Sequence, residues 1–288
     1  MVAVVAAILL QTHGLPPLHA QAVGRDRTMF VSALDNRGEP VEGLGPEAFV
    51  IREDGVRREV LRVSKATEPM DVAILVDNSA AMAEALTHVR EAVSGFAAGM
   101  APANTVALIG LADRPTVIVD YTRDAIRLAD GTGRLFPMSG SGMTLLDAVV
   151  ETSRGLVRRN SSRAVIVPVI TDGIEFTNRY SRDVTKALVE GRIALHAVTV
   201  GQFDYAEDHA VRERAFFLEA GPRDSGGQRT FLLSAHGLTP ALQRLARELS
   251  SQYKVVYARP ESLIPPEKST VSSGRPGVTM RGTPARGE

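Results

Sequence analysis

Two apolar runs near the middle of the chain each end abruptly in small polar residues, and this pattern constrains the fold most strongly. Residues 72–76 read Val-Ala-Ile-Leu-Val and lead into Asp77, while the apolar run 164–170 leads into Thr171 and Asp172. Strands of a parallel sheet are buried on both faces, so they appear in a sequence as continuous apolar runs. Because ligand sites in such sheets lie beyond the carboxyl ends of the strands, we expect Asp77 and Asp172 at one edge.

Strand-like and helix-like segments alternate from residue 70 to residue 250. The expected strands are 70–77, 105–112, 115–120, 164–171, 193–200 and 229–233, and the expected helices are 81–100, 144–158, 181–190, 207–220 and 238–250. This alternation predicts an α/β fold, in the form of a Rossmann-like, doubly wound, mainly parallel sheet with helices on both faces. The tight link at Asp113-Arg114 predicts that the second and third strands are antiparallel neighbours.

The two ends of the chain lack this alternation and carry short strand candidates instead. These candidates are 28–34, 49–53, 58–63, 254–257 and 278–280. Asp54-Gly55 separates two of them and is a strong signal for a β-hairpin. For the end of the chain, composition equally allows a frayed tail after about Arg259.

The N-terminal residues have features of an export signal. Residues 2–10 form an apolar run that is too short to span a bilayer, which needs about 20 residues. His19-Ala20-Gln21-Ala22 has the small-x-small pattern of a signal-peptidase site. We therefore expect residues 1–22 to be a signal peptide and the protein to be exported: periplasmic, on the cell surface or secreted. A frayed helix is the alternative, since no Lys or Arg precedes Arg25. No later segment reads as a membrane span.

Composition excludes several classes of function. The 288-residue chain has 33 Lys and Arg against 33 Asp and Glu, which gives no long-range attraction to nucleic acid or anionic membranes. Cysteine is absent, so disulfides, thiolate metal sites and a cysteine nucleophile are excluded. There is no Gly-x-Gly-x-x-Gly turn after the first long strand, no Walker lysine motif and no Gly-x-Ser-x-Gly elbow. We therefore expect the protein not to be an enzyme.

Four oxygen-bearing residues stand at the expected strand ends or near them: Asp77, Ser79, Thr144 and Asp172. Carboxylate and hydroxyl oxygens gathered at one edge suit a hard cation such as Mg²⁺, with water completing an octahedron. Each residue also has a simpler interpretation. Asp77 and Thr144 are plausible helix N-caps, and Asp172-Gly173 is an ordinary turn sequence.

The order and spacing of these residues resemble the von Willebrand factor type A domain. The metal-ion-dependent adhesion site of that family consists of Asp-x-Ser-x-Ser, a separate Thr and an Asp in a Thr-Asp-Gly turn. Here residues 77–81 read Asp-Asn-Ser-Ala-Ala, Thr144 matches the second element, and residues 171–173 read Thr-Asp-Gly. The resemblance implies Mg²⁺, or alternatively Mn²⁺ or Ca²⁺, at Asp77, Ser79, Thr144 and Asp172. Ala81 replaces a serine that supplies one metal oxygen, so we expect weak or absent binding.

The flanking sequences resemble a bacterial subfamily of these domains named for acidobacteria. The similarity lies in residues 35–44 and 49–55, in Gly226-Gly227, and in Glu248-Leu249 followed by Tyr253. It implies that the tail strands 253–258 and 276–281 return to the leader and complete a small β-sandwich-like unit. The expected organisation is a signal peptide (1–22), an N-terminal β unit (23–67), a type A-like domain (68–251) and C-terminal strands (252–288).

The resemblance also implies a function. We expect a non-enzymatic, exported protein-binding or adhesion-type domain, in which the metal binds an acidic side chain of a protein partner. The alternative is a metal-independent structural or assembly component of a cell-envelope complex. A hydrolase that uses Asp77 or Ser79 is the least favoured interpretation.

Three further polar residues have structural or auxiliary interpretations. Glu175 is expected as a solvated charge at a helix start, or alternatively as an outer carboxylate of the metal site. Asp147 is expected to be a structural hydrogen-bond acceptor. His196 lies within an expected strand and should be packed inside the protein.

Overall fold

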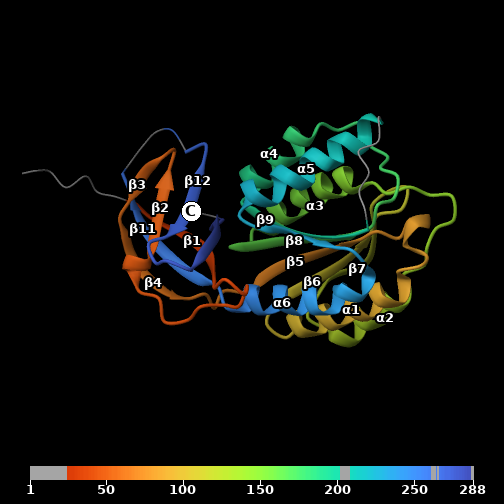
Figure 1. Cartoon of the computed structure of the whole chain (residues 1–288), viewed down its shortest axis with the longest axis horizontal. Coiled ribbons are helices and arrows are strands. Elements are labelled where there is room, and N and C mark those ends of the chain that lie inside the picture. The colour runs from red at the N-terminus through yellow and green to blue at the C-terminus, as the bar shows by residue number, and fades with distance from the viewer. Residues whose placement is uncertain (1–24, 202–207, 261–263, 265, 287–288) are drawn as a thin grey trace, which may run out of the picture.

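The computed structural model describes residues 25–201, 208–260, 264 and 266–286, and it divides into an α/β body and a smaller β unit beside it (Figure 1). The expected signal peptide, residues 1–22, lies outside the described residues. No helix among the described residues has the length and apolar character that a membrane crossing requires. The body contains the candidate site, and the β unit joins the two ends of the chain.

The body is built on a six-stranded sheet in the order β10-β9-β8-β5-β6-β7. Its strands are β5 (Met70–Val76), β6 (Thr105–Gly110), β7 (Thr116–Thr122), β8 (Arg163–Ile170), β9 (Ile193–Val200) and β10 (Gln228–Leu232). All neighbouring pairs are parallel except β6 and β7, which are antiparallel as predicted. Every residue of β5 and β8 is buried, which explains their continuous apolar sequences.

Helices cover both faces of this sheet, which confirms the predicted fold class (Figure 1). One face carries α1 (Leu86–Met100), α2 (Ala125–Gly133) and α6 (Leu238–Ser250), and the other carries α3 (Leu145–Arg159), α4 (Ser181–Gly191) and α5 (His209–Ser225). Successive β5 side chains enter the two cores in turn: Ile74 packs in the core that contains Phe96, and Leu75 packs in the core that contains Phe217. Because alternate side chains of this buried strand point to opposite faces of the sheet, the strand packs against both helical layers.

Three helices differ from the expectation, and one of them is α5, which ends at Ser225, five residues beyond the expected end at 220. The expected helix 81–100 begins only at Leu86, after a 3-10 turn at Ala80–Met82. The backbone of the preceding segment is held elsewhere, because the Asn78 carbonyl accepts a hydrogen bond from Met138 N at 2.9 Å. Helix α2 was not predicted, although Asp124 caps it by accepting hydrogen bonds from the backbone amides of Ile126 and Arg127.

The β unit consists of two small sheets that share one apolar core. The first has the order β13-β1-β11-β4, and the second has the order β12-β2-β3. Their strands are β1 (Arg25–Leu34), β2 (Phe49–Glu53), β3 (Val56–Arg58), β4 (Val60–Lys65), β11 (Tyr253–Arg259), β12 (Ser269–Ser273) and β13 (Thr279–Pro284), with a 3-10 turn at Pro46–Ala48 before β2. Met29, Ile51 and Val255 meet in the core.

The pairing of the two chain ends confirms the predicted β-sandwich-like unit. Strand β1 lies between β11 and β13 and is antiparallel to both. The alternative of a frayed tail after Arg259 is therefore wrong for residues 266–286. Strand β12 was not predicted, and β13 begins three residues later than the expected strand 276–281. The Asp54-Gly55 turn is confirmed, since both residues have positive φ, as a two-residue turn of this type needs. The expected strand 58–63 is wrong as its second arm, because β2 pairs with β3 and the separate strand β4 pairs with β11 in the other sheet.

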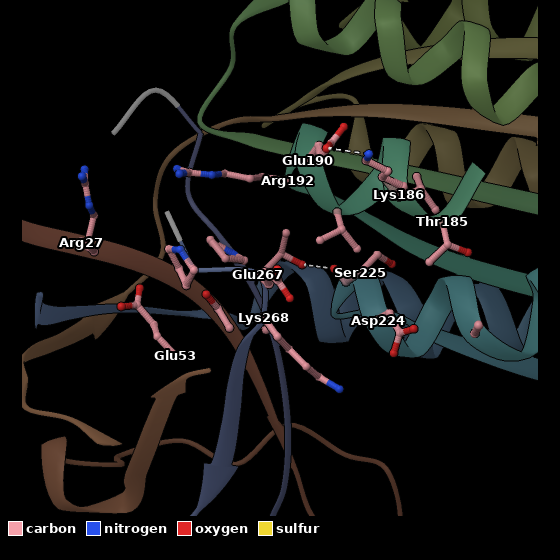
Figure 2. Close-up of a pocket in the computed structure, with 18 of the residues that line it drawn as sticks. Arg27, Glu53, Thr185, Lys186, Glu190, Arg192, Asp224, Ser225, Glu267 and Lys268 are labelled. Carbon is pink, nitrogen blue, oxygen red and sulfur yellow. Dashed lines mark hydrogen bonds and ion pairs between the residues drawn. The ribbon is translucent and has the colours of Figure 1, made fainter. Parts of the chain in front are cut away.

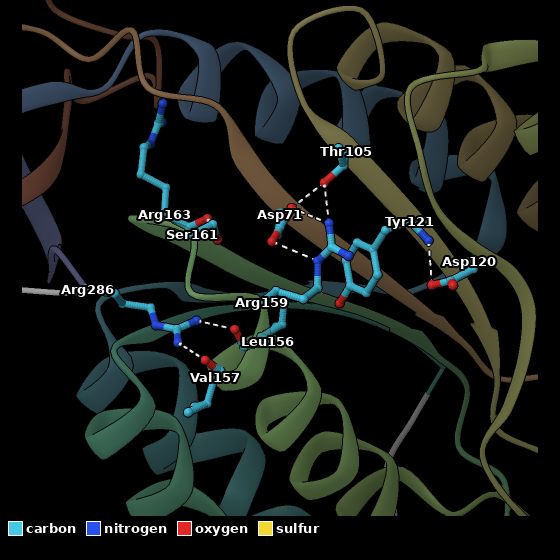
Figure 3. A network of polar contacts seen from close by, with 10 residues as sticks. All are labelled: Asp71, Thr105, Asp120, Tyr121, Leu156, Val157, Arg159, Ser161, Arg163 and Arg286. Atoms are coloured by element: carbon cyan, nitrogen blue, oxygen red, sulfur yellow. Dashed lines mark hydrogen bonds and ion pairs between the residues drawn. The ribbon is translucent and has the colours of Figure 1, made fainter.

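Three arginines, Arg159, Arg163 and Arg286, lie near the amino ends of the body strands and bond to neighbouring segments (Figure 3). Arg159 Nε donates to Asp71 Oδ2 at 2.9 Å, and its guanidinium lies 4.1 Å from the centroid of the Tyr121 ring. Burial raises the pKa of Asp71, but the hydrogen bonds from Arg159 and Thr105 lower it by a larger amount. The pKa of Asp71 is therefore below its usual value. Arg286 donates to the carbonyls at the end of α3 and fixes the tail.

Arg163 is the buried member of this region and joins three segments. It donates to the carbonyls of Glu68 at 2.7 Å and Leu249 at 3.1 Å, and to Gln252 Oε1 at 2.8 Å. Glu68 lies in the link that enters the body, and Leu249 and Gln252 lie where the chain leaves it. Arg163 thus holds both chain segments that connect the β unit to the body.

We predict that Arg163→Met lowers the free energy of unfolding by about 3 kcal/mol, because buried carbonyl groups lose their donors. Urea denaturation checks this value. The matched control is Arg158→Met at the exposed end of α3, where a surface change should stay within about 0.5 kcal/mol. Equal stability of the two variants would contradict the role of Arg163.

His196 is packed inside β9, as expected, and neither ring nitrogen has a hydrogen-bond partner among the described residues. Burial lowers its pKa from 6.5 to about 4, against the opposing charge of Glu248. The unfolded chain takes up this proton below about pH 6.5, while the folded chain does not until about pH 4. Acid therefore favours unfolding through this residue.

We predict that the wild-type protein loses up to about 3 kcal/mol through His196 between pH 6.5 and pH 4, and that His196→Leu removes this loss. The measurement is the free energy of unfolding in urea at several pH values. The leucine variant should equal or exceed the wild type at pH 7, since two unpartnered buried nitrogens are gone. Identical pH slopes for both proteins would show that His196 is not responsible.

Candidate functional site

Three loops at the carboxyl ends of β5 and β8 form one hydrogen-bonded edge. They are residues 77–85, 134–144 and 171–180. Met143 N donates to the Ile174 carbonyl at 2.7 Å, and Phe176 N donates to the Met143 carbonyl at 2.7 Å. With the bond between Met138 N and the Asn78 carbonyl, these contacts join the loops that carry all of the predicted site residues.

Asp77 is fully buried and links two of these loops. Its Oδ1 accepts a hydrogen bond from Ser79 N at 2.9 Å. Its Oδ2 accepts one from Thr171 N at 3.1 Å and another from the Thr171 hydroxyl. Asp77 does not cap α1, which starts nine residues later at Leu86. The interpretation of Asp77 as a simple helix cap is therefore wrong.

Ser79 places a buried hydroxyl oxygen at this edge. Its Oγ has no hydrogen-bond partner among the described residues. The backbone of Gly173 packs against it, since a Cβ added at position 173 would lie 2.9 Å from Ser79 Oγ and 3.1 Å from Ala81 Cβ. A buried polar atom without a partner in a native fold calls for an explanation such as a bound ion or water.

Thr144 precedes α3, but its side chain does not cap that helix. The hydroxyl donates to the Leu111 carbonyl at 2.8 Å, which leaves its oxygen lone pairs to accept. Glu175 provides the cap instead: its carboxylate accepts hydrogen bonds from Leu145 N at 3.3 Å and Leu146 N at 3.2 Å. The first turn of α3 is thus held by a residue of the third loop.

Glu175 is buried, so the expectation of a solvated charge at a helix start is wrong. Burial raises its pKa to about 8, although the two amide donors and Arg214 act in the opposite direction. Asp147 has the structural role expected of it, since it accepts a hydrogen bond from Arg179 Nε at 2.5 Å.

Asp172 is exposed and is the open carboxylate of the edge. It lies against the end of β9, because a Cβ added at Gly201 would be 3.4 Å from Asp172 Cγ. The positive φ of Gly201 favours glycine there. Asp172 is therefore accessible from solvent, whereas Asp77 and Ser79 lie beneath it in the fold.

Arg214, on α5, also contacts this edge, and the sequence does not predict a role for it. Its side chain is only 2% exposed, and Nη1 donates to the Gly173 carbonyl. Burial lowers the pKa of its guanidinium, while the nearby charges of Glu175, Asp77 and Asp172 raise it. No sequence motif marks Arg214, which sits 41 positions from its bonded partner.

These residues fit a metal ion only in part. Ser79 supports the fit, because it offers a buried oxygen without a partner among the described residues. Ala81 opposes it, because it has no oxygen at the position of a ligand. Among the described residues, no group of three His, Asp or Glu side chains is arranged to hold a metal. Any ion would therefore need hydroxyl and water oxygens in addition to the carboxylates of Asp77 and Asp172.

Exposed apolar side chains surround this edge on the second and third loops. They are Phe136, Met138, Ile174, Phe176 and Tyr180, and each is between 45% and 64% exposed. Arginines lie over two of their rings, Arg90 at 4.9 Å from the Phe136 centroid and Arg182 at 5.5 Å from the Tyr180 centroid. We call these five residues the apolar rim. Their exposure leaves apolar surface on two of the three loops.

A cleft lies elsewhere, between the β unit and helices α4 and α5 (Figure 2). Its volume is about 970 Å³, and its charged lining includes residues of both signs. Several of these charges pair among themselves, as in Lys186 with Glu190 at 3.7 Å, and Arg259 Nε with Glu53 at 3.5 Å. None of the four predicted site residues lines this cleft.

Residues 72–175 match the family model of the von Willebrand factor type A domain. The matched segment runs from β5 to Glu175 and includes all four predicted site residues. It does not include the β unit. Among curated protein sequences, none matches the chain.

Solved structures share the fold at low sequence identity. Proximal thread matrix protein 1 from the mussel byssus is 13% identical with a TM-score of 0.52, over 69% of this chain and 50% of that one. A form of the same protein with zinc in its MIDAS motif is 12% identical with a TM-score of 0.51, over 69% and 49%. BatB from Bacteroides thetaiotaomicron is 18% identical with a TM-score of 0.48, over 63% and 100%.

We predict that Gly173→Ala destabilises the protein by about 1–3 kcal/mol, because the new methyl group would overlap Ser79 Oγ and Ala81 Cβ. Gly99→Ala on α1 is the control. That position has open space, and alanine there should stabilise the helix by about 0.5–1 kcal/mol. Thermal and urea denaturation compare the two variants. A Gly173→Ala protein as stable as wild type would show that Gly173 is not closely packed against Ser79.

Proposed function

We propose that the chain is a non-enzymatic, exported protein-binding domain of adhesion type, whose partner docks at the edge formed by the three loops. The observation that carries this proposal is the buried, unpartnered hydroxyl of Ser79 among the described residues, next to the exposed carboxylate of Asp172. An oxygen that the fold itself leaves unsatisfied indicates a ligand. The apolar rim around it provides contact area for a protein.

Under this proposal, Asp77, Ser79, Thr144 and Asp172 hold a divalent cation, Mg²⁺ first and Mn²⁺ or Ca²⁺ as alternatives. Ser79 and Thr144 contribute hydroxyl oxygens, and the two aspartates contribute carboxylates. The bound ion supplies a positive site for an acidic side chain of the partner. Ala81 contributes nothing, so water must replace one protein oxygen and the affinity is low.

The second candidate is a metal-independent structural or assembly component of a cell-envelope complex. Two observations favour it: Ala81 at a ligand position, and the buried positive charge of Arg214 among the site carboxylates. In this case the apolar rim, without a metal, carries the interaction.

Export and domain organisation are also part of the proposal. A signal peptide over residues 1–22, a periplasmic, surface or secreted location and the division at about residues 67 and 251 agree with the composition of the chain ends. The likeness to the subfamily named for acidobacteria remains a sequence-based prediction.

Calorimetry with Mg²⁺, Mn²⁺ and Ca²⁺ on protein starting at Val23 tests the metal site. We expect weak binding by wild type, roughly tenfold tighter binding by Ala81→Ser through the restored oxygen, and no binding by Asp172→Ala. Ala83→Ser is the control, because it adds a hydroxyl at an exposed position of the same loop outside the motif. If Ala81→Ser shows no detectable binding of any ion, the metal-independent candidate becomes the better one.

A further inference from the structure

A positive charge is already present at the proposed site. Arg214 extends from α5, is 2% exposed and donates a hydrogen bond to the carbonyl of Gly173. Gly173 directly follows Asp172 and packs on Ser79 Oγ. The guanidinium therefore lies immediately behind the loop that carries the exposed carboxylate.

The charges that face Arg214 are mostly negative and come from three segments. Asp77 follows β5 and Asp172 belongs to the loop after β8, and both favour the charged form of the arginine. Glu175, in the same loop as Asp172, adds to this only where it is ionised, above its raised pKa of about 8. Arg229 on β10 is a nearby cation that acts against it. An arginine keeps its charge even when buried, so this positive charge is permanent.

We propose that Arg214 is the resident cation of this site and balances its carboxylates in place of a metal ion. The inference rests on the proposed use of this edge for binding. It also accounts for Ala81. A site that already holds a positive charge gains less from a divalent ion, because the guanidinium repels the ion and shares the same carboxylates. The loss of the serine oxygen at position 81 then costs little binding energy.

The first test measures coupling between charges in metal-free protein. Asp77→Asn, Arg214→Gln and the double variant are compared with wild type by urea denaturation in the presence of a chelator. We expect Asp77→Asn to destabilise the wild type clearly and the Arg214→Gln protein much less, since its partner charge is gone. If Arg214→Gln alone does not fold, the double variant should fold again. Strictly additive effects, or a double variant that stays unfolded, would overturn the proposal.

The second test measures Mn²⁺ affinity by calorimetry in the Ala81→Ser background. Arg214→Gln should raise the affinity at least tenfold, while Arg214→Lys, which keeps the charge, should leave it low. Arg212→Gln removes an exposed charge from the same helix and should change nothing. An equal rise for the lysine and glutamine variants, or no rise for glutamine, would count against a role of charge.

The two tests separate this inference from the proposed metal site. The stability cycle contains no metal and no partner, so coupling between Asp77 and Arg214 is measured whether or not Ala81→Ser binds an ion. Coupling without any metal binding supports Arg214 and rejects the metal. Metal binding without coupling supports the metal site and rejects Arg214.

Discussion

The carboxylate of Asp77 is the contact on which the candidate site depends. It accepts hydrogen bonds from Ser79 N, Thr171 N and the Thr171 hydroxyl, and so joins the ends of two adjacent parallel strands. Parallel strands bring their carboxyl ends together, but the loops beyond them diverge unless something connects them. Asp77 makes that connection in the protein interior, where hydrogen bonds to a charged group are strong. Ser79 and Asp172 are positioned relative to one another as a result.

Electrostatics at this edge are unusual because a buried carboxylate group and a buried guanidinium meet there. Glu175 caps α3 and has a raised pKa, while Arg214 sits behind the adjacent turn. A buried polar group without a partner is destabilising, so Glu175 depends on the amides of Leu145 and Leu146, and Arg214 depends on the Gly173 carbonyl. Of the four predicted site residues, Asp77, Ser79 and Thr144 are buried, and Asp172 is exposed.

Local sequence patterns were sufficient for the sheet and for the loops of the site. These patterns depend on residues close together in the sequence. They are the apolar runs of β5 and β8, the alternation of strands and helices, and the Asp54-Gly55 turn. The roles of Glu175 and Arg214 were beyond such reasoning, because Glu175 bonds a helix 30 positions away and Arg214 a carbonyl 41 positions away. The start of α1 was misplaced for the same reason, since distant loop contacts hold residues 78–82.

The pairing of β1 with β11 and β13 imposes an order on synthesis and folding. β1 is made first, yet both of its neighbours lie more than 200 positions later in the chain. The α/β body between them closes on itself and needs neither end for its sheet. Pairings across such sequence distances form late. The apolar face of β1, with Met29 and Val31, therefore stays uncovered on the emerging chain until the body is complete. During that interval β1 is exposed to wrong pairing with another chain, as is β2, whose partner β12 is also made late.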